Sequence, residues 1–247
     1  MKSERVKLEI AEIIEFANEK LAKGEKDLQH LSNVIGVTNY IRIADRIKGV
    51  FKSGKILDWG CGFGQMSYLL NNRGLDVVAY NVKQNVSSCL LDRIKYVVSD
   101  EELKLPFNNE QFDAVLSCGV LEHVQSADES LCEISRILRQ RGYFFTFMLP
   151  NKLSYTEFIS DVRGISAHPV KYSVRSIEQL YRKHGFRIIE IRRSNMIPRN
   201  LTGLPSFIKK IYSKFYIVLN LIDRLLSSLP LVNSVAGVFE VIAVKEG

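Results

Sequence analysis

Hydrophobic positions along the chain follow two different periods. In residues 1–51 apolar side chains recur at steps of three and four, as on one helix face, and Gly24 separates two helical stretches. From residue 55 onward, short apolar runs typical of buried strands alternate with helical segments. The strand-like runs lie at residues 55–58, 75–80, 94–98, 112–117, 143–149, 186–191 and 238–244. This alternation predicts an α/β fold with a mostly parallel sheet and helices on both faces.

Polar residues mark where the intervening helices begin. Ser126 with Glu129, and Ser176 with Gln179, have the spacing of capping boxes. Together with the apolar periodicity they predict helices over residues 65–72, 86–93, 126–142 and 176–185. We therefore expect a helical N-terminal extension at 1–51 and an α/β domain at 52–247, with an apolar helical insertion at about 204–235.

Composition narrows the class of protein. With 247 residues, 46% hydrophobic and 25% charged, the chain is neither a disordered tail nor a disulfide scaffold. No signal core or apolar run of about 20 residues is present, and a net charge of +7 permits an anionic partner without requiring one. The cysteines, Cys61, Cys89, Cys118 and Cys132, lie far apart without metal-ligand spacing. They predict reduced thiols in a cytoplasmic protein and no metal site.

A glycine-rich loop follows the first strand. Gly60, Gly62 and Gly64 alternate between the strand and a helix, which lets the backbone approach a ligand closely. A dinucleotide fingerprint would need glycine where Gln65 stands, and the Gly-Lys-Ser/Thr of a phosphate-binding loop is absent. Asp58, at the strand end, suits a cationic group better than a pyrophosphate.

These residues carry a resemblance to a known family. Residues 56–64 (Ile-Leu-Asp-Trp-Gly-Cys-Gly-Phe-Gly) resemble motif I of the class I S-adenosylmethionine-dependent methyltransferases. Residues 105–107, 112–117 and 120–124 resemble the subgroup that includes quinone-biosynthesis, sugar and natural-product enzymes. The likeness covers roughly residues 40–192 and the last strand. It implies a Rossmann-like, seven-stranded sheet whose last strand runs antiparallel.

The resemblance also implies a cofactor, S-adenosylmethionine, which leaves as S-adenosylhomocysteine. It assigns cofactor-binding positions to Asp58, Gly60, Cys61, Gly62, Gly64, Asn81, Asp100, Glu101 and Ser117. Asp58 would orient the ammonium group, Asp100 would contact the adenine amino group, and Ser117 would line the reactive side. Asn81 departs from the family, whose members carry a carboxylate there for the ribose hydroxyls, and a neutral acceptor should bind them more weakly.

Candidates on the methyl-acceptor side are two histidines. Methyl transfer from a sulfonium needs positioning and exclusion of water, and an oxygen or nitrogen acceptor can also need a base. His123 follows the fourth strand, and His168 lies in the loop after the fifth, although either could serve only in packing. Tyr40 and Tyr155 could line the site or simply pack.

The segment from Leu204 to Val235 is long and apolar, with lysines near its start. It is too short and too charged to span a bilayer, so it indicates an amphipathic helix. Such a helix could pack on the core or on a second copy. Alternatively, residues 205–230 could contact a membrane surface around a lipid-linked acceptor, which would make the protein membrane-peripheral.

Three functions fit these features. The first is methyl transfer to an oxygen or nitrogen of a small molecule such as a sugar, a quinone or a lipid-linked metabolite. The second replaces that acceptor with RNA, using the basic cluster of Arg182, Lys183, Arg187, Arg192 and Arg193, although no RNA-binding module accompanies it. The third is a non-catalytic partner protein that binds the cofactor, for which Asn81 is the supporting feature. The intact loop from Asp58 to Gly64 favours the enzyme.

Overall fold

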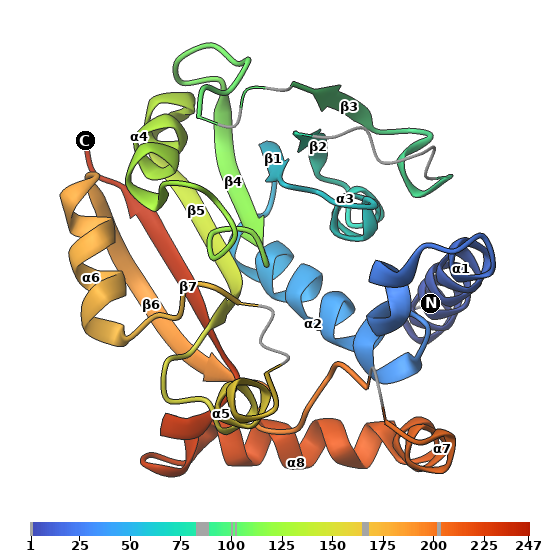
Figure 1. Cartoon of the computed structure of the whole chain (residues 1–247). Coiled ribbons are helices and arrows are strands. Elements are labelled where there is room, and N and C mark those ends of the chain that lie inside the picture. The colour runs from blue at the N-terminus through green and yellow to red at the C-terminus, as the bar shows by residue number, and fades with distance from the viewer. Residues whose placement is uncertain (1, 83–88, 100, 102, 165–167, 202–203) are drawn as a thin grey trace.

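A single seven-stranded sheet organises the protein (Figure 1). The computed structural model describes residues 2–82, 89–99, 101, 103–164, 168–201 and 204–247. The strands are β1 (Lys55–Trp59), β2 (Asp76–Asn81), β3 (Lys95–Val98), β4 (Phe112–Cys118), β5 (Leu138–Pro150), β6 (Phe186–Ser194) and β7 (Val238–Lys245). Their order is β3-β2-β1-β4-β5-β7-β6, and β7 runs antiparallel to both neighbours. This confirms the predicted fold, including its antiparallel last strand.

Helices cover both faces of the sheet. They are α1 (Lys2–Ala22), α2 (Val34–Val50), α3 (Gln65–Asn71), α4 (Ala127–Ile137), α5 (Tyr155–Val162), α6 (Val174–Lys183), α7 (Ser206–Lys214) and α8 (Tyr216–Ser228). Short 3-10 helices lie at η1 (Lys26–Leu31), η2 (Cys89–Leu91) and η3 (Val232–Val235). Figure 1 shows α1, α2 and α3 on one face and α4 and α6 on the other. The parallel strands need such cover because both of their faces carry apolar side chains.

The N-terminal helices share their core with the sheet. Ile13 of α1 and Ile47 of α2 belong to the same buried cluster as Ile56 of β1 and Phe145 of β5. On the opposite face, a second cluster joins α4 and α6 to the alternate residues of the same strands. Residues 1–51 thus help to cover one face of the sheet.

Two predicted helix boundaries were wrong. The helix after Ser126 ends at Ile137 and not at Gly142, because Leu138 pairs with Phe112 and starts β5, with a β-bulge following. The next capping box is formed by Ser173 and Ser176, so α6 begins at Val174. Local polar spacing did not distinguish the two possible starts of α6, because Ser173 and Ser176 both offer a capping side chain. Of the helix predicted over 86–93, residues 86–88 lie outside the described part, and 89–91 form η2.

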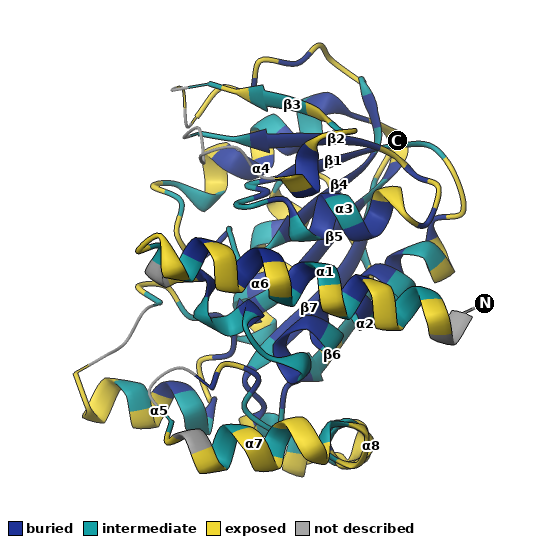
Figure 2. Ribbon diagram, turned by 90° about the vertical axis from the view of Figure 1, so that its right-hand side faces the viewer, coloured by how far each residue is buried: buried dark blue, intermediate teal, exposed yellow. Residues whose placement is uncertain are grey.

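The apolar segment forms two helices instead of one. The chain turns at Phe215, between α7 and α8, and these helices lie with α5 at the end of the sheet toward which β6 points (Figure 1). Their outward side chains are exposed, as the yellow positions of Figure 2 show. Among the helices in the described ranges, none is both long and apolar enough to cross a membrane.

Candidate active site

The glycine loop is held in a fixed shape at the ends of β1 and β2. The amides of Gly60 and Cys61 both donate to the carbonyl of Tyr80, at 2.9 Å each. Gly60 has φ of +72°, and a Cβ there would lie 2.6 Å from Val120, so only glycine fits. Gly62 also has positive φ, at +55°, but a Cβ there would meet nothing within 4 Å. A Cβ at Gly64 would lie 2.5 Å from the Leu91 side chain, so the loop is packed at both ends and open at Gly62, where a ligand can approach its backbone.

Asp58 lies buried beneath this loop. Its side chain is 2% exposed and accepts a hydrogen bond of 2.5 Å from the Ser67 hydroxyl. Burial raises the pKa of Asp58 to about 6, although the bonds from Ser67 act to lower it. The group is thus mostly ionised at neutral pH, and a cation placed beside it would be favoured.

The neighbouring strand ends bring further predicted positions to the same edge. Asn81 ends β2, and its carbonyl accepts from the amide of Ser99 at 3.3 Å. The Tyr80 hydroxyl donates to the carbonyl of Glu101 at 3.0 Å, which fixes the exposed Glu101 beside the end of β2. Asp100, the predicted adenine contact, lies outside the described residues.

The end of β4 supplies a polar wall. Ser117 is fully buried, and its hydroxyl has no hydrogen-bond partner among the described residues. Burial raises the pKa of the neighbouring Cys118 thiol well above its usual range, so it stays neutral. Tyr40 of α2 is buried within electrostatic reach of Cys118 and Asp58. Its burial fits either of the two roles that the sequence left open, lining the site or packing. The Tyr155 hydroxyl donates to the carbonyl of Met196.

The two histidines predicted for the acceptor side lie close together. The rings of His123 and His168 lie 5.7 Å apart, although they come from distant parts of the chain. Nδ1 of His168 lies 2.9 Å from Oε1 of Glu157, a residue of α5. That bond raises the pKa of His168 against the effect of burial, while burial and the nearby His168 lower the pKa of His123.

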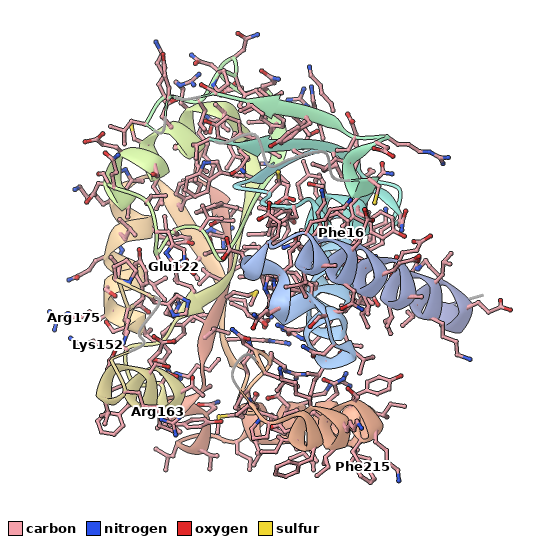
Figure 3. All side chains as sticks on the ribbon, turned by 45° about the vertical axis from the view of Figure 1, so that its right-hand side comes forward. Phe16, Glu122, Lys152, Arg163, Arg175 and Phe215 are labelled. Carbon is pink, nitrogen blue, oxygen red and sulfur yellow. The ribbon has the colours of Figure 1, made fainter. Side chains whose placement is uncertain are left out.

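Two carboxylates complete this group, and the sequence did not single them out. Glu122 is 2% exposed, its Oε2 has no hydrogen-bond partner among the described residues, and burial raises its pKa to about 7. Glu157 contacts His168 and Lys171, which hold its pKa below the ordinary value although burial acts to raise it. Figure 3 shows Glu122 in the interior, whereas Lys152 and Arg163 lie on the outer side near α5. In the sequence, the signal that could have pointed to Glu122 as a site residue was its position directly before His123.

The same group offers ligand atoms for a metal ion. Single ligand atoms of Glu122, His123 and His168 all lie within 4.8 Å of one another. The sequence predicted no metal site, because the third residue is far from the other two along the chain. The remaining histidines stand apart: His30 contacts the carbonyl of Asp27, and His184 ends α6 beside Asp128. All four cysteines are free, in agreement with the predicted thiols.

Comparison with known proteins agrees with this geometry. Residues 57–146 match the family model of a methyltransferase domain. An uncharacterized protein of Methanocaldococcus jannaschii, MJ1252, is 30% identical over 160 residues, which cover 62% of this chain and 57% of that protein. The mitochondrial ubiquinone biosynthesis O-methyltransferase of Rattus norvegicus is 35% identical over 125 residues, or 45% of this chain and 36% of that enzyme. The chain thus spans about half, or less, of the length of these curated relatives.

Solved structures share the fold at low sequence identity. A possible histamine N-methyltransferase of Thermotoga maritima has a TM-score of 0.61 at 15% identity, covering 97% of this chain and all (100%) of that one. The 1,6-didemethyltoxoflavin-N1-methyltransferase of Burkholderia thailandensis, solved with S-adenosylhomocysteine, has a TM-score of 0.57 at 16% identity, covering 84% of this chain and 79% of that one. Residues 57–146 thus match a methyltransferase domain, and the sheet order gives the chain the fold of the S-adenosylmethionine-dependent methyltransferases among these solved structures.

Proposed function

We propose that this protein transfers a methyl group from S-adenosylmethionine to an oxygen or nitrogen of a small molecule. The observation that carries the proposal is the fixed loop, open at Gly62, above the buried carboxylate of Asp58. Asp58 would hold the cofactor's ammonium, and the backbone of Gly60, Cys61, Gly62 and Gly64 would lie along its amino-acid part. Asn81 would take a ribose hydroxyl, Asp100 and Glu101 the adenine, and Ser117 the side nearest the sulfonium.

The cofactor supplies a methyl group on a good leaving group, so the protein contributes position and a proton acceptor. The acceptor's lone pair forms the new bond to the methyl carbon as the carbon–sulfur bond breaks, and the electron pair stays on sulfur. The acceptor's proton goes to Nε2 of His168, whose Nδ1 faces Glu157 at 2.9 Å. Glu157 would fix the ring and stabilise the imidazolium that forms, while His123 would line the same space.

The acceptor class is supported by the relatives' names. These include an O-methyltransferase of ubiquinone biosynthesis and the sarcosine/dimethylglycine N-methyltransferase of Aphanothece halophytica, so both acceptor atoms occur among them. For the alternative RNA acceptor, the basic cluster gives little support. Lys183 pairs with Asp128 and Arg192 with Glu190, which leaves fewer free cations on that surface.

A lipid-linked acceptor and peripheral membrane contact belong to the same proposal. On α7, on α8 and at the turn between them, exposed apolar side chains include Phe207, Ile211, Phe215, Ile217, Val218, Leu221, Ile222 and Leu225. Figure 3 shows Phe215 at the outer edge of the molecule. Lys209, Lys210 and Lys214 accompany these side chains, and an apolar helix face with cations beside it is typical of binding to anionic membranes. Residues 205–230 would therefore hold the enzyme on the surface from which a lipid-linked acceptor enters.

Calorimetric titration tests the cofactor assignment. We expect S-adenosylmethionine and S-adenosylhomocysteine to bind and NAD not to bind. Asp58→Asn should weaken both about tenfold or more, because the ammonium loses a charged partner. Asp76→Asn is the matched control, since Asp76 is an exposed acid at the opposite end of β2. Absence of binding to the wild-type protein, or equal affinity in Asp58→Asn, would overturn the proposal.

A further inference from the structure

Exposed apolar side chains are concentrated in two segments of the chain. Among the described residues, all but five of the large hydrophobic side chains that are exposed lie in residues 153–170 and 207–235. The five exceptions are Leu8, Val50, Val98, Leu103 and Ile189. The first segment contains α5, and the second contains α7, α8 and the residues that follow them. Large apolar patches on a protein surface mark sites of interaction, so these segments are candidates for one.

The two segments lie side by side in the folded chain. The side-chain amide of Asn151, which precedes α5, donates to the carbonyls of Ser234 and Ala236 at 2.8 Å each. Tyr155, the first residue of α5, lies within electrostatic reach of Tyr212 on α7. Figures 1 and 2, seen from perpendicular directions, both show α5, α7 and α8 at the same end of the molecule. We call this surface, made of α5, α7, α8 and residues 229–235, the apolar end face.

Two helices of the apolar end face bury an acid and expose apolar side chains. In α5 the buried side chain is Glu157, whereas Phe158 is 68% and Val162 73% exposed. In α8 the buried side chain is Asp223, whereas Leu221 is 54% exposed. A helix on a water-facing surface has the opposite arrangement, with its apolar stripe turned toward the core. Both helices therefore present an apolar side to whatever lies outside the protein.

The charges of the apolar end face favour an anionic lipid layer over a second copy of the chain. Lys152, Arg163 and Lys214 are exposed and have no carboxylate partner among the described residues. The acids of α5 and α8 are each paired with a cation of this chain. In a symmetric dimer the same patch meets itself, so these cations would face one another without acids between them. Anionic headgroups supply the missing negative charge, and acyl chains receive the apolar side chains.

We infer that the apolar end face docks on an anionic lipid layer through α5 as well as α7 and α8, and that the methyl acceptor reaches its site from this layer along α5. The inference rests on the proposed function, whose membrane contact involves residues 205–230 alone, and extends that contact to a second helix. It also assigns the acceptor to a chemical class, namely an amphiphile with an apolar tail and a hydroxyl or amine in its head.

The link between this surface and the acceptor side is Glu157. It belongs to α5, and its Oε1 lies 2.9 Å from Nδ1 of His168. The outer side of α5 thus carries exposed apolar side chains, and its inner side carries the partner of the proposed base. A helix with its side chains is about 10 Å across. The tail of an amphiphile can therefore stay in the layer while its head projects about that far to reach His168.

Vesicle sedimentation with the full chain is the first arm of the test, using phosphatidylcholine vesicles that contain or lack phosphatidylglycerol. We expect the protein to bind the vesicles that contain phosphatidylglycerol. Replacing Phe158 and Val162 together by Ser should weaken this binding at least fivefold, because two apolar side chains lose their contact with lipid. Leu8→Ser with Ile189→Ser is the matched control, since both side chains are exposed outside the apolar end face. Unfolding midpoints check that each variant folds.

Tryptophan fluorescence is the second arm, and it distinguishes lipid from a second copy. The chain has one tryptophan, Trp59, which is buried. We expect brominated acyl chains in anionic vesicles to quench the added fluorescence of Phe158→Trp and not that of Leu8→Trp. A second copy that covered α5 would carry no bromine, so quenching identifies lipid as the occupant.

The outcomes separate this inference from the rest of the proposed function. If the Phe158 and Val162 variant binds vesicles as the wild type does, while replacing Leu221 and Leu225 abolishes binding, the contact is confined to residues 205–230 and the inference is wrong. It is also wrong if the wild type binds neither kind of vesicle or both equally, or if Phe158→Trp is not quenched. Binding of S-adenosylmethionine, measured by calorimetry without lipid, tests methyl transfer independently of all these results.

Discussion

The contact between His168 and Glu157 leads to a prediction about the pH dependence of methyl transfer. Glu157→Gln keeps the shape of the side chain and removes its charge. The Nδ1 to Oε1 distance is 2.9 Å, and the His168 side chain is 32% exposed. A hydrogen bond to a charged group contributes about 1.5–3 kcal/mol when buried. Solvent screening at this exposure reduces it to about 1 kcal/mol. If the imidazolium forms as the methyl is transferred, the rate should fall about fivefold.

The direction of the pH effect follows from the raised pKa of His168. A base must be neutral to accept a proton, so the wild-type rate falls as the pH drops through the pKa of His168. Without the Glu157 charge that pKa drops, and the acidic limb of the profile should move to lower pH. The same raised pKa means that His168 stabilises the fold at low pH and that this contribution is lost as the pH rises through its folded pKa.

Two measurements check this prediction. The Cε1–H resonances of the histidines give their pKa values by NMR, without any knowledge of the acceptor. Methyl-transfer rates across pH follow once an acceptor screen provides a substrate. Asp161→Asn is the control, because Asp161 shares Lys171 with Glu157 but does not bond His168. If the pKa of His168 in both Glu157→Gln and Asp161→Asn equals its value in the wild type, the reasoning is wrong.

Three further predictions concern the cofactor site and α8. Asn81→Asp should bind S-adenosylmethionine about tenfold more tightly by calorimetry, since a carboxylate is the stronger acceptor for ribose hydroxyls; equal or weaker binding would contradict this. Because the pKa of Asp58 is about 6, cofactor affinity should fall as the pH drops through 6, and Asp58→Asn should lack this dependence. Replacing Leu221 and Leu225 together by Ser should lower binding to anionic vesicles at least fivefold, measured by sedimentation. Ile189→Ser, an exposed change on β6, should leave binding unaltered, and a concentration-dependent dimer lost in the double variant would indicate a second copy instead.

The features that the sequence predicted well depend on short stretches of chain. The strand cores and the loop from Asp58 to Gly64 are set by local periodicity and by glycine conformations. The end of α4 was misplaced because strand pairing between Leu138 and Phe112 decides it, and pairing partners are distant in the sequence. Long-range contacts therefore account for the misplaced end of α4, whereas the start of α6 was misplaced by a local signal, because Ser173 and Ser176 both offer a capping side chain.

The same distinction separates the two halves of the site. The family match covers residues 57–146 and so includes the cofactor loop and His123, but it ends before Glu157, His168 and α8. Glu157 and His168 come from the connection after β5, and His168 meets Glu122 only in the folded chain. The helix α8 comes from the connection after β6. In this protein the proposed cofactor site lies mostly in one short segment that relatives share, whereas the proposed acceptor site is formed by packing between distant segments. Variants at Glu157 and Leu225 therefore probe what distinguishes this protein from its relatives, and variants at Asp58 probe what it shares with them.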